Sequence, residues 1–94
     1  MNSRIEDYGA QKVYYSNARL LGKTALLAGP FLTATDAEKS LDIVGPAFVQ
    51  MDPRSQAATF GVMECKAPGP GVGNLNHLLP GEMIANLAVP VWLH

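Results

Sequence analysis

Nine glycines and seven prolines divide this 94-residue chain into short segments. Glycine loses more backbone entropy on folding than other residues and proline lacks a hydrogen-bond donor, so both interrupt helices and central strands. Their positions favour short strands and turns over long helices. We therefore expect a mainly β fold, a small sandwich or barrel with at most one short helix near 36–44. An α+β arrangement with two short helices is the alternative.

The first third of the chain is expected to contain two strands. Lys12–Ser16 is aromatic and β-branched, which favours a short strand. A loop over 17–23 and a strand near 24–33 should follow. A helix over 17–28 is the alternative interpretation, but Gly22 in its middle would cost about 1 kcal/mol relative to alanine.

The short helix is predicted from its capping residues. Thr35 and Glu38 have the spacing of a capping box, in which both side chains bond free backbone N–H groups at a helix start. The helix would cover 36–44, with Gly45-Pro46 as its end.

A β-hairpin is predicted around a turn at 52–55, where a proline lies between polar residues. Residues 46–52 form the first arm, and the alternating polarity of 57–65 indicates the second. The two arms would pair antiparallel and bury Phe48 or Phe60 against the core.

Composition and charge restrict the class of partner. Seven Lys and Arg against eight Asp and Glu give a net charge of −1, and the cations are scattered singly. A nucleic-acid-binding protein usually carries a cationic stripe, so we expect no nucleic-acid partner. The apolar stretches 24–35 and 83–94 are shorter than the roughly 20 residues that span a bilayer, so no membrane partner is expected either.

The N-terminal residues include acids where a signal peptide would have bases. A single cysteine, Cys65, fits a reducing compartment better than a secreted protein. We therefore expect cytoplasmic synthesis without a signal peptide or a transmembrane segment.

Two patterns suggest catalysis or nucleotide binding, and each has a simpler structural interpretation. Residues 17–24 end in Gly-Lys-Thr as a phosphate-binding loop does, but Asn17 replaces the first glycine and Gly29-Pro30 stops any long helix after it. Cys65 and His77 could form a nucleophile and its base. However, Cys65 ends an apolar strand, where a buried structural cysteine is more common.

Other titratable groups give no stronger signal. Glu6-Asp7 and Asp36/Glu38 are close carboxylate pairs, whose positions at a terminus and on a first helical turn favour solubility or helix-dipole roles. A closed zinc site needs four ligands, and the only soft ligands are Cys65, His77 and His94. We expect no metal, no cofactor and no catalytic residue, which disfavours an enzyme.

Residues 67–94 form a charge-poor C-terminal arm of what we expect to be a single domain over 1–94. The arm carries one formal charge, Glu82, among many apolar side chains. Large apolar patches on a soluble protein mark interaction sites, and the Pro-Gly run at 67–73 would act as a hinge that lets the arm reach a neighbour. The predicted interface consists of apolar residues of the arm: Leu79, Ile84, Leu87, Val89, Val91, Trp92 and Leu93.

These features favour a non-catalytic assembly or interaction protein. It would form a homo-oligomer or dock on a larger protein assembly such as a virion or a shell. The alternative is a small-ligand-binding domain or minor enzyme with a pocket at a subunit interface. Its pocket groups would be Tyr14, Tyr15, Arg19 and His77. A hollow above about 300 Å³ with convergent polar residues would favour that alternative.

Overall fold

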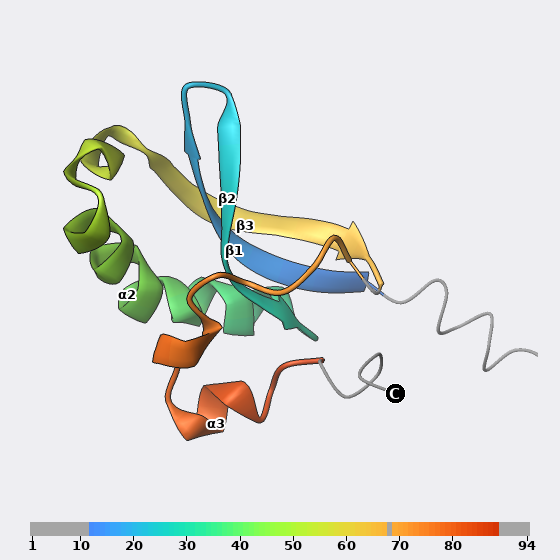
Figure 1. Ribbon diagram of the computed structural model, residues 1–94. Helices are drawn as coiled ribbons and strands as arrows, with labels where there is room; N and C mark the ends of the chain where they lie inside the picture. The colour runs from blue at the N-terminus through green and yellow to red at the C-terminus, as the bar shows by residue number, and fades with distance from the viewer. Residues whose placement is uncertain (1–11, 68, 89–94) are drawn as a thin grey trace, which may run out of the picture.

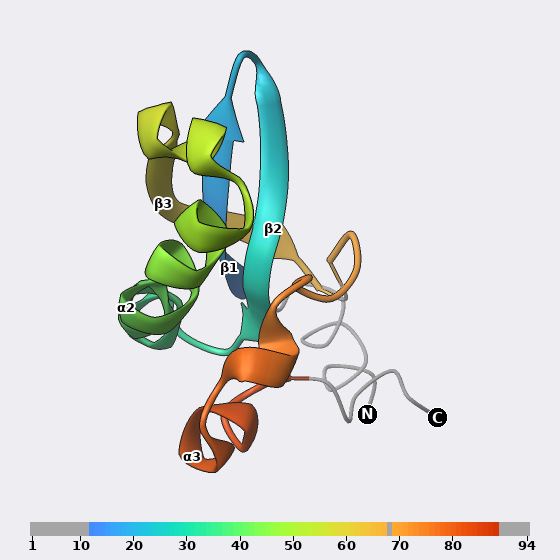
Figure 2. The same ribbon diagram turned by 60° about the vertical axis from the view of Figure 1, so that its left-hand side comes forward.

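The computed structural model of the protein describes residues 12–67 and 69–88. Three strands form one antiparallel sheet in the order β2-β1-β3. A single long helix, α2, packs across one face of this sheet (Figure 1). The segment after β3 passes around β2 and ends in the short helix α3 (Figure 2).

Strands β1 (Lys12–Leu20) and β2 (Lys23–Phe31) form a long hairpin whose tip stands away from the body of the molecule (Figures 1 and 2). The last ladder pair joins Leu20 to Lys23, so the turn consists of Leu21 and Gly22. Both turn residues have positive φ, at 52° and 79°. These values fit the two-residue type I′ turn, whose twist matches that of the two strands it connects.

The two strands predicted in the first third of the chain are confirmed, but the loop predicted at 17–23 is wrong. Residues 17–20 remain extended and pair with β2 on one side, and 17–19 also pair with β3 on the other. A central strand satisfies its backbone groups on both sides, and this tertiary pairing extends β1 beyond its apolar and aromatic part.

Helix α2 (Ala34–Met51) has eighteen residues and is longer than the helix predicted near 36–44. Its N-cap is Thr33, whose hydroxyl accepts the backbone N–H of Asp36 at 3.1 Å, so the predicted capping box at Thr35 is wrong. The helix also continues through Gly45-Pro46, its predicted end. Proline removes one intrahelical hydrogen bond, and the packing of the helix on the sheet outweighs that loss.

The hairpin predicted around 52–55 is wrong. Its first arm forms the last turns of α2, and Pro53–Ala57 is the 3-10 helix η1. Its second arm is a strand, β3 (Thr59–Lys66), but this strand pairs with β1. Phe48 on α2 and Phe60 on β3 therefore meet where the helix packs on the sheet. The ring of Phe48 packs edge-on against that of Phe60, with ring centroids 6.4 Å apart.

The main core lies between α2 and the sheet. Leu27, Phe31 and Val44 are fully buried there. A buried polar contact adds to this packing, because the Ser40 hydroxyl donates to the Ser16 hydroxyl at 2.9 Å. Each of these hydroxyls has a partner, so their burial leaves no unsatisfied hydrogen bond.

Residues 69–88 fold back over the edge of β2. The backbone N–H groups of Gly73, Asn74 and Leu75 donate to β2 carbonyl oxygens at 2.8–2.9 Å. Beside them, the Asn76 side chain accepts the backbone N–H of Gly29 at 2.9 Å and donates to its carbonyl at 2.7 Å. These bonds join the segment to β2 as an additional edge.

Two glycines of the hinge predicted at 67–73 lie against the strands of the sheet. The Tyr15 hydroxyl donates to the carbonyl oxygen of Gly71. Gly73 lies so close to the backbone of Ala28 that a Cβ at this position would overlap it. At position 73 the backbone approaches β2 so closely that only glycine is small enough.

The predicted interface residues have different environments. Leu79 and Leu87 are buried in the protein's own core, at 5% and 9% exposure. Ile84, in helix α3 (Gly81–Ile84), is exposed. The other four, Val89, Val91, Trp92 and Leu93, lie outside the described residues.

The expected class, mainly β with α+β as its alternative, is confirmed. Helix α2 takes the place that the second sheet of a sandwich would occupy. Among the described strands β2 and β3 are the outer two, and the segment 73–75 is bonded along β2. Among the described helices, none is both long and apolar enough to cross a membrane.

Candidate interaction surface

The Gly-Lys-Thr sequence at 22–24 belongs to the hairpin, as its interpretation as an ordinary turn predicts. Gly22 is in the turn and Lys23 begins β2. The backbone N–H groups of a phosphate-binding loop lie between a strand and a helix. Here the residues on both sides of the turn are strands.

Cys65 lies in β3, half-buried beside Val13 and Tyr15. Burial raises the pKa of its thiol, and the Glu64 carboxylate raises it further. His77 is exposed in the 3-10 helix η2 (Asn76–Leu78). A raised thiol pKa is the opposite of what a cysteine nucleophile requires.

The Cys65 thiol is therefore expected to react slowly with iodoacetamide at pH 7, and its reaction rate should still be increasing above pH 9. The thiolate is the reactive form, and a raised pKa reduces its fraction at neutral pH. Mass spectrometry of the native protein, with the urea-unfolded protein as control, measures both rates. Equal rates for native and unfolded protein would contradict the burial of this side chain.

The four residues proposed as pocket groups do not form one pocket. Tyr14 packs in the main core on the α2 side of the sheet, and Tyr15 packs in a second cluster with Val13 and Ala88. Neighbouring residues of a strand point to opposite faces, which separates these two rings. Neither Arg19 nor His77 lines a described hollow.

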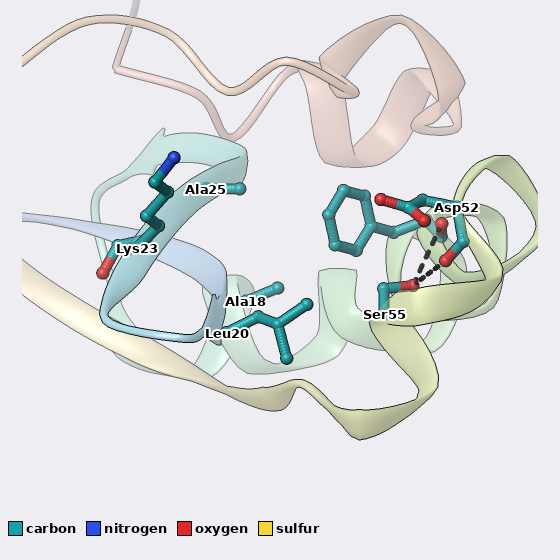
Figure 3. A pocket seen from close by; sticks show the side chains of 8 residues that line it. Ala18, Leu20, Lys23, Ala25, Asp52 and Ser55 are labelled. Carbon is teal, nitrogen blue, oxygen red and sulfur yellow. Dashed lines mark hydrogen bonds between the residues drawn. The ribbon is translucent and has the colours of Figure 1, made fainter.

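An apolar hollow lies between the hairpin and the C-terminal end of α2. This groove has a volume of about 340 Å³. One wall comes from both hairpin strands and the other from α2 and η1 (Figure 3). The residues that line it are Ala18, Leu20, Lys23, Thr24, Ala25, Phe48, Asp52 and Ser55.

The Asp52 carboxylate and the Ser55 hydroxyl of the groove are already engaged. The Asp52 carboxylate accepts hydrogen bonds from the backbone N–H, Nε and Nη2 of Arg54, each at 3.1 Å. These bonds to Arg54 lower the pKa of Asp52. The Ser55 hydroxyl donates to the backbone carbonyl of Asp52 at 2.6 Å (Figure 3). Lys23, on the opposite wall, makes no salt bridge within the described residues.

Two exposed apolar residues are next in sequence to residues that line the groove. Leu21 is at the hairpin tip, between Leu20 and Lys23, which both line the groove. Its side chain is 92% exposed. Met51, the last residue of α2, is 67% exposed. The groove, the hairpin tip and the end of α2 together form one surface, which we call the tip surface.

Leu21 has an unfavourable backbone conformation. Its φ of 52° places it in the left-handed region, which costs a residue with a Cβ about 1–2 kcal/mol. Asparagine and glycine are the residues that normally occupy this position of a type I′ turn. The sequence therefore places a large apolar side chain where it is both strained and exposed to solvent.

Leu21→Asn is expected to stabilise the isolated protein by about 1 kcal/mol, because asparagine adopts the left-handed conformation more easily. Urea unfolding followed by circular dichroism measures the change, at protein concentrations low enough that both proteins are single chains. The matched variant Leu78→Asn replaces an exposed leucine outside the turn and should give no such gain. A loss of stability in Leu21→Asn would contradict the strained turn.

A second hollow, of about 350 Å³, lies between α2 and α3. It is lined by Asp36, Lys39, Glu82, Met83 and Asn86. Asp36 belongs to one of the two carboxylate pairs noted in the sequence, and the other, Glu6-Asp7, lies outside the described residues. In the part of the chain with described positions, no three His, Cys, Asp or Glu side chains gather as metal ligands.

The tip surface thus combines a groove, an exposed strained leucine and a lysine that has no salt bridge to any residue with a described position. Sequence reasoning missed it because residues 46–52 were expected to be a strand. Comparison of the chain with protein-family models, with curated proteins and with solved structures finds no match.

Proposed function

We propose that this protein is a non-catalytic interaction protein that associates with other protein chains through the tip surface. The observation that carries the proposal is Leu21, a leucine that is 92% exposed in a left-handed conformation. Strained residues that persist in a fold are concentrated at functional positions. An exposed apolar side chain at such a position gains most when a partner buries it.

The neighbouring groove supports the same function. Its lining is apolar where Ala18, Ala25 and Phe48 meet, and its Asp52 carboxylate and Ser55 hydroxyl are bonded within the protein. Such a hollow accepts an apolar side chain without leaving a polar group unsatisfied. A buried apolar anchor surrounded by polar residues is the usual composition of a protein–protein hot spot.

A small-ligand site in the groove is the second candidate function. The volume of about 340 Å³ is at the lower end of the range for ligand pockets. However, ligand sites fix orientation with convergent polar groups, and Asp52 and Ser55 are used by Arg54 and the local backbone. If the groove takes a small apolar ligand, indole should stabilise the wild type but not Ala25→Phe, which fills the hollow.

The interaction function is tested by the native size of the protein in extracts of cells that produce it. Gel filtration with antibody detection should place the wild type and Leu78→Asn above the size of one chain. Leu21→Asn should elute as one chain, although it is the more stable protein. Elution of the wild type as one chain would contradict the proposed function. Equal elution of wild type and Leu21→Asn would exclude the tip surface as the site.

A further inference from the structure

We infer that the partner at the tip surface is a second copy of this chain, and that each copy inserts its hairpin tip into the groove of the other. This inference rests on the proposed function and names its partner. The tip surface carries both a projecting apolar group, Leu21, and an apolar groove of about 340 Å³. A surface with both features is complementary to itself, as a two-fold interface requires.

The positions of the two features along the hairpin fit a two-fold arrangement. Ala18 and Ala25 line the groove three and four residues from Leu21. If two hairpins overlap antiparallel by about 10 Å, three residues of strand, each tip reaches the level of the partner's groove. The hairpin stands away from the body at this end, which leaves it accessible to a second copy (Figure 2).

The dipole of α2 gives this arrangement one favourable electrostatic contact. Between residues 12 and 35 the chain has three cations, Lys12, Arg19 and Lys23, and no acid. Lys12 is paired with Glu64 at 2.9 Å. Lys23 is next to the turn and would approach the partner's end of α2. That helix end has no basic residue in its last turn, where the helix dipole favours a cation, and Asp52 follows it. Asp52 is paired with Arg54, so the favourable partner of Lys23 at this end is the helix dipole.

The small side chains in the groove provide the space for a leucine. Ala18 and Ala25 form the hairpin wall, opposite Phe48 on α2. A larger residue at 25 would fill the groove without altering the hairpin tip. This separates the two halves of the interface experimentally, since Leu21→Asn removes the inserted group and Ala25→Phe removes the space for it.

The test is sedimentation equilibrium of the purified full chain, with circular dichroism to verify folding. We expect the wild type and Leu78→Asn to be dimers at micromolar concentration. Leu21→Asn should raise the dissociation constant by about 100-fold or more, because each dimer contains two such contacts. Ala25→Phe should weaken the dimer similarly, and Lys23→Glu should weaken it less.

A wild type that remains monomeric at all concentrations would overturn the inference. If the same protein still elutes above one chain in cell extracts and Leu21→Asn does not, the proposed function stands and the partner is a different protein. A dimer that Leu21→Asn and Ala25→Phe leave intact would also overturn the inference, because the two copies would then associate through another surface.

Discussion

Replacing Leu79 and Leu87 together by alanine is expected to leave the protein largely unfolded at room temperature. Both side chains are buried in the main core with Phe31 and Ala37. Each leucine-to-alanine change in a core costs about 2–5 kcal/mol. The two together are comparable with the whole stability of a small domain, about 5–15 kcal/mol. Circular dichroism and urea unfolding measure the loss.

The matched control is the double variant Leu78→Ala and Ile84→Ala. It removes the same amount of side chain from the same segment, but at positions that are 41% and 47% exposed. Its stability should remain close to that of the wild type. If both double variants were equally folded, residues 69–88 would not be part of the core. The charge-poor arm would then be free to bind a partner, as the sequence alone suggests.

Phe31→Ala is expected to lower the free energy of unfolding by about 3–5 kcal/mol. Phe31 is fully buried at the end of β2 and forms an antiparallel bridge with Leu87. Phe31 therefore connects the sheet, helix α2 and the segment 69–88 in one core. The loss should appear as a lower urea midpoint with the slope unchanged.

Phe60→Ala provides the comparison for this variant. The sequence alone makes Phe60 a core residue of a hairpin, but in the structure its ring is half-buried against Phe48. The same ring deletion should therefore cost clearly less at 60 than at 31. A larger loss at Phe60 would contradict the half-buried position of its ring.

The β-rich class and most strand positions could be predicted because they depend on local composition. Lys12–Ser16 and 57–65 have strand character in any context. The end of the helix could not be predicted. Gly45-Pro46 is a strong local stop signal, yet α2 continues through it because its buried face, including Val44, packs on the sheet. Tertiary packing of this kind is not visible in a single sequence.

Because residues 46–52 were predicted to be a strand, the groove could not be predicted either. Phe48 and Asp52 lie opposite Ala18 and Ala25 only when α2 extends to Met51. The exposed position of Leu21, by contrast, could have been predicted from the sequence. Leu21-Gly22 between two β-compatible runs has the length of a two-residue hairpin turn, and leucine is a poor choice for it. The C-terminal arm is charge-poor for a different reason from the one expected, because much of it is core.

The central claim is that Leu21 of one copy contacts Phe48 of another. Isotope-filtered NMR on a mixture of labelled and unlabelled protein detects contacts between copies and ignores those within one chain. We predict intermolecular NOEs from the Leu21 methyl groups to the Phe48 ring and to the Ala25 methyl group. A dimer whose intermolecular NOEs come from the outer edge of β3, with none from Leu21, would contradict the claim.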